Sequence, residues 1–314
     1  QAQNPDPILF GRGGLPLSAS NTLRGGDTAT GIVGMMTYTW GGNSASPNSY
    51  RVRPINALNG YVNFEASNPR PEDAPALTGR LRVVGMNLLN FFNTFADGNS
   101  LTPGCFPSGT DADCRGAESQ FEFDRQWQKT VAAITGTGAD VIGVTEMEND
   151  GYGADSAIQF LVDRLNDATA PGTYAFIDAD LGTGQINALG LDAIKVGLIY
   201  KTASVMPVGM TAALNTDAFI NGGDSAPRNR AALAQAFEEV GTGARFVVTV
   251  NHLKSKGSAC DDPDALDGQG NCNIVRTNAA NELTAWLASD PTQTGDPDVL
   301  IIGDLNSYAM EDPI

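Results

Sequence analysis

The chain has 314 residues, enough for two domains, and 41% of them are hydrophobic, enough to form a core. Its 36 acidic and 19 basic side chains give a net charge of −17, and no apolar run reaches the ~18 residues of a membrane span. This composition argues against a membrane span and against a generally basic nucleic-acid-binding surface, so a polyanionic substrate would need a local basic patch. The polar start, Gln1 to Pro5, lacks a signal peptide and an initiating Met, which indicates a processed or partial sequence.

Residues 1–66 are predicted to form a β-rich module. Strand-like segments cover 31–40 and 50–55, and the Gly/Asn/Ser/Pro-rich stretch between them is typical of a hairpin loop. A proline-dense segment at 67–79 follows and is predicted to be a linker. We therefore expect a second domain over residues 80–314.

In the second domain, strands and helices alternate irregularly. Apolar residues spaced three and four apart predict a helix over 121–134, and two further helices are expected at 155–165 and 278–287. Strands are expected at 81–86, 141–144, 194–200, 233–237, 246–250 and 299–302. Several strands follow one another without a helix between them. This pattern favours a layered α/β sandwich built on mixed sheets over a doubly wound sheet.

The four cysteines form two pairs that are close in sequence, Cys105 with Cys114 and Cys260 with Cys272. Each pair brackets a loop rich in Gly, Asp or Pro, which favours local disulfides and an oxidising compartment. Four cysteines allow three pairings. A zinc site built from all four is the alternative, but neither pair has the C-x-x-C spacing typical of such sites.

Three apolar strands end in side chains suited to phosphate chemistry. One ends at Glu146, one at His252, the only histidine of the chain, and one at Asp304 and Asn306. Carboxylates are the oxygen ligands that Mg²⁺ and Ca²⁺ prefer, and a histidine can donate to a phosphate oxygen or a leaving group. Asp304 and Asn306 alternate along the strand, so we expect both to point to the same side. The alternatives are a strand-end acid, a structural histidine and an Asx-turn.

Basic side chains gather near these strand ends. Lys254 and Lys256 follow His252, and Arg228 and Arg230 form a second short cluster. They could supply the local basic patch, with Arg230 as a phosphate clamp; scattered solvated charges are the alternative. Asn87, after strand 81–86, could bond a neighbouring carboxylate or a phosphate.

Several motifs together resemble a known family. In chain order, GMNLLN with Asn87, VTEMEN with Glu146, Arg230, VNHLKSKG with His252 and IIGDLN resemble the endonuclease/exonuclease/phosphatase superfamily, which has the fold of pancreatic-type deoxyribonuclease. The longer segments GMNLLNFF, EMENDGYG, DAIKVGLIYK, NHLKSKGSAC and GDLNSYAMEDPI resemble its secreted bacterial extracellular nucleases. This resemblance runs from residue 81 to the end. Residues 20–55 resemble, more weakly, the OB-like β module that often precedes that domain.

The resemblance implies a four-layer αββα sandwich preceded by a small all-β OB-like module. It also implies an extracellular or cell-surface bacterial enzyme that hydrolyses DNA, or RNA, to 5′-phosphate products. Glu146 and Asn87 would hold a divalent cation, Mg²⁺ first, with Ca²⁺ or Mn²⁺ as alternatives. Asp304 would orient water, and Asn306 and His252 would stabilise the phosphate. The expected substrate contacts are Arg230, Lys195, Lys254, Lys256 and Arg228.

The chain departs from that family at its end. Family members continue past the GDLN strand to a Ser-Asp-His motif, whereas this chain stops at Ile314. We therefore expect a remaining C-terminal part that includes strands of the second sheet, and we expect residues 1–314 to be inactive alone. Two alternatives stay open. One is a phospholipid or phosphoinositide phosphodiesterase or phosphatase of the same fold, and the other is a non-catalytic binding unit of a surface assembly.

Overall fold

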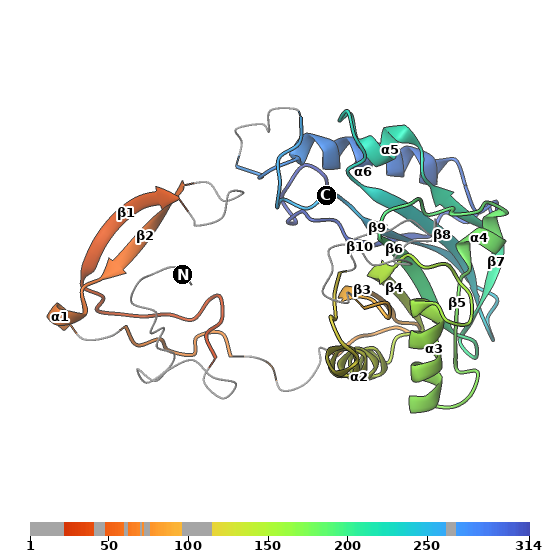
Figure 1. Cartoon of the computed structure of the whole chain (residues 1–314), viewed down its shortest axis with the longest axis horizontal. Coiled ribbons are helices and arrows are strands. Elements are labelled where there is room, and N and C mark those ends of the chain that lie inside the picture. Colours follow the sequence, from red (N-terminus) through yellow and green to blue (C-terminus); the bar gives the residue numbers. More distant parts are fainter. Residues whose placement is uncertain are drawn as a thin grey trace. The chain divides into compact units, whose positions relative to one another are not determined.

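The computed structural model of the protein describes residues 22–40, 48–59, 62–69, 71, 76–95, 115–261 and 268–314 (Figure 1). The chain divides into two compact units, Gln1–Thr78 and Gly79–Ile314. Each unit is described by itself.

The described part of the first unit contains an antiparallel ribbon. Strands β1 (Gly34–Trp40) and β2 (Asn48–Pro54) pair in a register that sets Tyr38 opposite Tyr50. The two tyrosine rings lie 4.9 Å apart between centroids, a cross-strand aromatic pair of the kind that stabilises such ribbons. A short helix, α1 (Asn56–Asn59), follows. Both predicted strands are confirmed, and the OB-like arrangement stays a prediction.

The second unit contains two four-stranded mixed sheets. The first has the order β3 (Val83–Phe91), β4 (Val141–Glu148), β6 (Ile194–Lys201), β5 (Tyr174–Phe176), and β3 runs parallel to β4. The second has the order β10 (Val299–Asp304), β9 (Arg245–His252), β8 (Arg230–Glu239), β7 (Val205–Leu214), and β10 runs parallel to β9. The remaining neighbours in both sheets are antiparallel.

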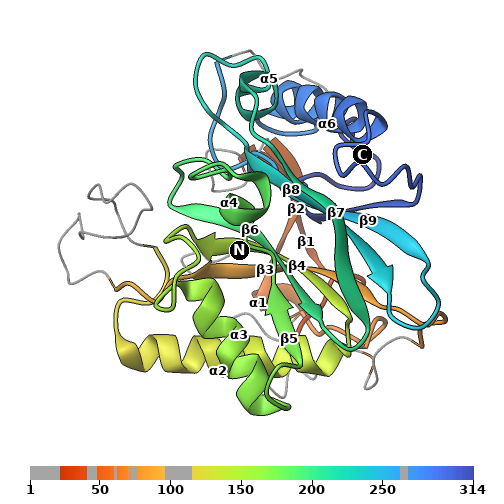
Figure 2. The ribbon, with the colours of Figure 1, turned by 90° about the vertical axis from the view of Figure 1, so that its right-hand side faces the viewer.

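Helices cover the outer faces of the two sheets. Figure 2 shows α2 (Gln120–Thr137) and α3 (Ala157–Ala168) against the first sheet, and α5 (Asp217–Asn221) and α6 (Asn273–Ala288) against the second. A fifth helix, α4 (Ala179–Thr183), contacts β7. The long helix α2 is capped at its start by Ser119, whose hydroxyl accepts a hydrogen bond from the Glu122 N–H, and at its end by Gly138 in the left-handed conformation. The predicted αββα sandwich is confirmed.

Apolar side chains fill the space between the layers. The inter-sheet core includes Val141, Leu198, Leu233, Phe237 and Val250, each 0% exposed. Burying a side chain of this size contributes about 1.5–3 kcal/mol. Separate clusters join α2 and α3 to the first sheet and α5 and α6 to the second.

Strand β10 lies at the edge of the second sheet, and two of its apolar side chains, Leu300 and Ile301, are exposed. The expectation of further strands beyond Ile314 stays a prediction. None of the helices in the described ranges combines the length and the apolar composition that crossing a membrane requires.

Glycines let the two sheets approach closely next to the strand ends. A Cβ atom on Gly143 of β4 would lie 2.5 Å from Cδ1 of Ile302 on β10. Gly303 has a φ of +119°, and a Cβ there would lie 2.1 Å from the carbonyl oxygen of Asn251. A larger residue at Gly143 would push the two sheets apart, and one at Gly303 would push β10 away from β9, its neighbour in the second sheet. Strands β4 and β10 therefore lie close together at Gly143.

Candidate active site

The ends of strands from both sheets bring three predicted site residues together. Glu146 lies on β4, His252 ends β9, and Asp304 ends β10. One ligand atom from each of these side chains lies within 4.8 Å of the others. The parallel pairing of β9 and β10 sets Asp304 directly beside His252, while Glu146 comes from the opposite sheet.

Asn87 on β3 bridges the two carboxylates. Its Nδ2 donates to Oε1 of Glu146 at 2.9 Å and to Oδ2 of Asp304 at 3.0 Å. Its Oδ1 accepts a hydrogen bond from the Leu89 N–H at 2.8 Å. The amide nitrogen positions both carboxylates, while the amide oxygen keeps a second lone pair besides its bond to the Leu89 N–H. The assignment of Asn87 as a metal ligand stays a prediction.

The backbone around the site is strained. Leu89, Asn90, Glu146 and Asn306 all have φ between 49° and 60°, in the left-handed region that L-residues rarely adopt. Each such residue costs on the order of 1–3 kcal/mol, and strain of this kind clusters at functional sites. The β4–β6 pairing shifts register between Val144 and Met147, and this irregularity redirects Glu146. The Asn90 N–H then donates to Oε2 of Glu146 at 2.9 Å.

Asn306 lies in a turn and not on the strand. Strand β10 ends at Asp304, the Asn306 N–H donates to Oδ1 of Asp304 at 3.0 Å, and Asn306 Nδ2 donates to the Leu253 carbonyl at 2.9 Å. The expectation that Asp304 and Asn306 alternate on one strand face is therefore wrong. The Asx-turn alternative describes this segment, because the Asp304 carboxylate accepts from a backbone N–H two residues on. One effect of the turn is to tie the segment after β10 to the segment after β9.

His252 is buried and uncharged at neutral pH. It is 4% exposed. Burial lowers its pKa, the guanidinium of Arg230 lowers it further, and the carboxylates of Asp304 and Glu146 oppose the shift. Its Nδ1 is buried and has no hydrogen-bond partner among the described residues. A neutral imidazole can accept a hydrogen bond or ligate a metal as well as donate.

The donor set fits a divalent cation. Glu146 and Asp304 are half-buried, and none of the ion pairs in the described ranges involves either carboxylate. Two like charges this close together repel each other unless a cation compensates them. Each carboxylate oxygen that accepts a hydrogen bond in the described part of the structure has a further lone pair for a second partner. The two carboxylate oxygens are ligands that suit Mg²⁺ or Mn²⁺.

The basic side chains near the site differ in their partners. Arg230 lies 3.4 Å from the Asp192 carboxylate, and Arg228 pairs with Asp224 at 3.0 Å and Asp261 at 3.4 Å. Lys256 pairs with Glu311, and its Nζ lies 4.5 Å from the centroid of the Tyr308 ring. Arg228, Arg230 and Lys256 are thus each paired with local acids.

Lys254 has a different environment. Its Nζ donates to neutral oxygens, the Ser255 carbonyl and the Ser258 hydroxyl, each at 3.0 Å. Burial lowers its pKa, and the guanidinium groups of Arg230, Arg228 and Arg276 lower it further. A cation placed among other cations, and bonded to neutral groups, is well suited to receive an anion.

Lys195 does not face the site. It is 1% exposed, and its Nζ donates to the Gly151 carbonyl and lies 3.9 Å from the centroid of the Tyr152 ring. Burial lowers its pKa to about 8, although Asp150 opposes the shift. The prediction that Lys195 contacts substrate is therefore corrected, because a side chain without solvent access cannot reach a bound polymer.

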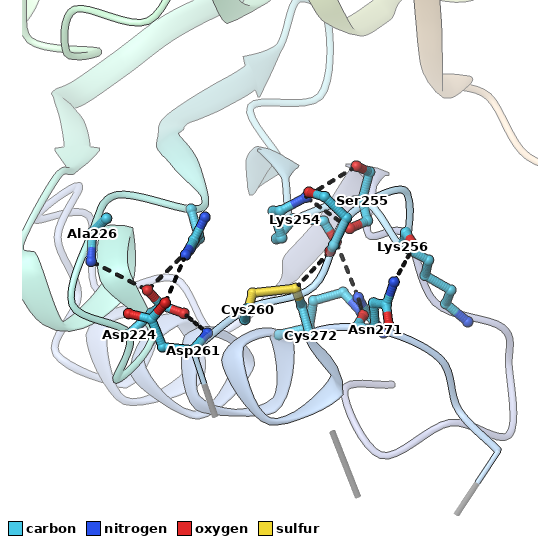
Figure 3. Close-up of a disulfide and its surroundings, with 12 residues drawn as sticks. Asp224, Ala226, Lys254, Ser255, Lys256, Cys260, Asp261, Asn271 and Cys272 are labelled. Atoms are coloured by element: carbon cyan, nitrogen blue, oxygen red, sulfur yellow. Dashed lines mark hydrogen bonds and ion pairs between the residues drawn. A yellow bond between two sulfur atoms is a disulfide. The ribbon is translucent and has the colours of Figure 1, made fainter. Parts of the chain in front are cut away.

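One predicted disulfide is present. Cys260 and Cys272 are bonded, with Cα atoms 5.3 Å apart and a sequence separation of 12. Figure 3 shows this bond between the Lys254–Lys256 segment and the pair of aspartates Asp224 and Asp261. Cys105 and Cys114 lie outside the described residues.

Two residues of the site carry no signal in the sequence. Asp192 precedes β6 and holds Arg230, and Asn90 presents its backbone N–H to Glu146. A lone aspartate in a loop and a backbone donor have no sequence signature. Their roles depend on contacts between segments 38 and 56 residues apart.

No protein-family model matches the chain, and no curated protein matches it. An endonuclease/exonuclease/phosphatase family protein from Bacteroides thetaiotaomicron is similar over 62% of this chain and 59% of its own, with 12% identity and a TM-score of 0.41. The human Nocturnin catalytic domain is similar over 74% of this chain and 66% of its own, with 15% identity and a TM-score of 0.43. ANGEL2, a 2′,3′-cyclic phosphatase, is similar over 58% of this chain and 44% of its own, with 15% identity and a TM-score of 0.39.

Endonuclease/exonuclease/phosphatase family proteins are thus among the solved structures to which this chain is similar. The chain spans less than two thirds of the length of each of the three structures compared above.

Proposed function

We propose that the second unit carries the active site of a secreted, divalent-metal-dependent phosphodiesterase that hydrolyses DNA, with RNA as a further substrate. The observation that carries this proposal is the convergence of Glu146, His252 and Asp304 within 4.8 Å, with Asn87 bonded to both carboxylates. Glu146 and Asp304 would hold the cation through their carboxylate oxygens, with His252 beside them. When bound, such a cation neutralises charge that develops on a phosphoryl group.

The chain's own residues have separable tasks in this reaction. Hydrolysis adds water across the P–O3′ bond and leaves a 5′-phosphate and a 3′-hydroxyl. Asp304, whose Oδ1 and Oδ2 each accept one described hydrogen bond, retains lone pairs that orient the attacking water. The neutral ring of His252 donates to a phosphate oxygen, and the second amide hydrogen of Asn306 adds another donor. Fixed donors of this kind stabilise the transition state without reorganising.

Lys254 and Arg230 are proposed to bind the substrate backbone. Lys254 bonds to neutral oxygens, and Arg230 begins β8, where its Cα pairs in register with His252. In a chain of net charge −17, these cations would supply the local attraction that a polyanion needs. The Cys260–Cys272 disulfide supports an oxidising, extracellular location.

The test compares hydrolysis of several phosphodiesters by the purified full-length protein, with the C-terminal part that the family resemblance implies. Plasmid DNA, RNA, sphingomyelin and inositol phosphates are incubated with Mg²⁺, with Mn²⁺ and with EDTA. We expect cleavage of the nucleic acids, loss of activity in EDTA and its return on adding metal. Preferential hydrolysis of sphingomyelin or inositol phosphates would replace the nuclease with the lipid or phosphoinositide alternative. Failure on every substrate, together with failure to bind Mn²⁺, would favour a binding unit.

Two matched variants assign the activity to the site. Asp304→Asn should lower kcat by about 100-fold or more, because it removes a charge that acts at the reacting group. Asp298 precedes the same strand at its opposite end, so Asp298→Asn is the control and should retain wild-type activity. Equal activities of the two variants would contradict the proposed site.

A further inference from the structure

Arg276 is a completely buried arginine that contacts the segments leaving the candidate site. It lies on α6 and is 0% exposed. Its Nη1 donates to the carbonyl oxygens of Lys254 at 3.1 Å and Asn271 at 2.6 Å, and its Nε donates to the Ser307 hydroxyl at 3.2 Å. Removing a guanidinium from water is costly unless fixed acceptors compensate for the lost hydration. The acceptors that Arg276 contacts therefore show which segments it holds in place.

Two of these contacts anchor the segments that leave the sheet beside the site. Lys254 follows His252 by two residues, and Ser307 comes directly after Asn306. The same two segments are joined nearer to the sheet by the Leu253 N–H, which donates to the Asp304 carbonyl, and by Asn306 Nδ2. The planar guanidinium of Arg276 is a second connection between these two segments, farther from the sheet.

The third contact links the site to the disulfide. Asn271 precedes Cys272, the residue just before α6, and the Asn271 side chain donates to the Lys256 carbonyl at 3.2 Å. Figure 3 shows Asn271 and Cys272 beside the Lys254–Lys256 segment. The disulfide and α6 thus hold Arg276 in a fixed place. The rigid guanidinium in turn holds both segments.

We propose that Arg276 is a positioning residue for the proposed hydrolysis: it sets the placement of Lys254 relative to Asp304 and Asn306, which come from a different strand. This inference rests on the proposed function. Arg276 does not touch the reacting atoms; it acts through the Lys254 carbonyl and Ser307. A lysine in its place would keep the charge but lose the fork that reaches several acceptors at once.

The first test compares Arg276→Lys with the wild type, and includes Asn278→Ala as a structural control on the same helix. Asn278 donates to the Gly222 carbonyl, away from both site segments. We expect R276K to lower kcat by about 10-fold or more, as loss of an outer-shell contact typically does, and N278A to lower Tm without lowering kcat of the folded protein. A folded R276K protein with wild-type kcat and KM would overturn the proposal.

Ser307→Ala provides a test that does not depend on the folding of R276K. It removes one partner of Arg276 and leaves the guanidinium in place. We expect a smaller fall in kcat than for R276K, with Tm near that of the wild type. Unchanged kcat in S307A, together with an R276K protein that only unfolds, would mean that Arg276 is purely structural and would overturn the proposal.

Hydrogen exchange separates this inference from the proposed function. If the wild-type protein hydrolyses none of the substrates, the proposed function fails. The positioning role would still require backbone amides 253–256 and 305–308 to exchange faster in R276K or S307A than in the wild type. Unchanged exchange in both segments would overturn it independently of any activity.

Discussion

Asn87 and Asp304 are 217 positions apart in the sequence, and Nδ2 of Asn87 donates to Oδ2 of Asp304 over 3.0 Å. The same nitrogen also donates to Glu146, on the neighbouring strand of its own sheet. One amide group therefore sets the separation of two carboxylates that come from opposite sheets. Such a bridge keeps two like charges close together before any cation is bound.

Substitution of Asn87 tests whether this bridge matters for metal binding and catalysis. We expect Asn87→Ala to weaken Mn²⁺ binding and to lower kcat, each by about 10- to 100-fold, because the carboxylates lose the donor that orients them. Titration calorimetry with Mn²⁺ and steady-state kinetics measure the two effects. Leu89→Ala, a change of an exposed side chain in the same segment, is the control and should change neither value. Wild-type Mn²⁺ affinity in N87A would contradict the positioning role.

The two lysines after β9 should differ in their effect on substrate binding. Lys254→Ala should raise KM for DNA and reduce the slope of log K against log salt by about 0.7–0.9, the value for one phosphate contact. Lys256→Ala should leave that slope unchanged, because Lys256 already pairs with Glu311. Binding measured by fluorescence anisotropy at several salt concentrations checks both expectations. Equal slopes for K254A and the wild type would exclude Lys254 as a phosphate contact.

The lowered pKa of Lys195 should make the free energy of unfolding depend on pH. Burial lowers its pKa from 10.5 to about 8 in the folded protein. Between these two values the unfolded chain binds more protons at this residue than the folded chain does, so the free energy of unfolding rises with pH. We expect the difference in unfolding free energy, wild type minus Lys195→Met, to increase between about pH 8 and pH 10. Urea unfolding at several pH values measures it, and a constant difference across that range would contradict the prediction.

The disulfide should contribute strongly to stability. A bond that closes a loop of sequence separation 12 restricts the unfolded chain, and this is worth about 3 kcal/mol in the chain-entropy description. The double variant Cys260→Ser/Cys272→Ser should therefore unfold at a lower urea concentration. The slope of the unfolding free energy against urea concentration should stay similar. Reduction of the wild-type protein should lower the stability at least as much, because it would also open the predicted Cys105–Cys114 bond. A variant as stable as the oxidised wild type would show that contacts such as those of Arg276 hold the loop without the bond.

Part of the fold was predictable because local patterns agree with the tertiary structure. The spacing of Phe123, Trp127, Val131 and Ile134 predicted a helix, and α2 buries that face against the first sheet. Runs such as Phe246–Val250 are apolar because both faces of β9 are covered. Strand β7 was missed because Pro207 and Gly209 interrupt it, which an edge strand with a register shift tolerates.

By itself, the sequence determined which residue types stand at the ends of the site strands, and so it identified Glu146, His252 and Asp304. It also determined the local cysteine pair, since Cys260 and Cys272 need only a short loop to meet. The tertiary structure alone decided that the Asn87 amide faces two carboxylates, that Lys195 is buried and that Arg276 links two site segments. These relationships depend on where side chains from distant strands and helices point, because spacing along the chain specifies a face of an element but not its partner across the core.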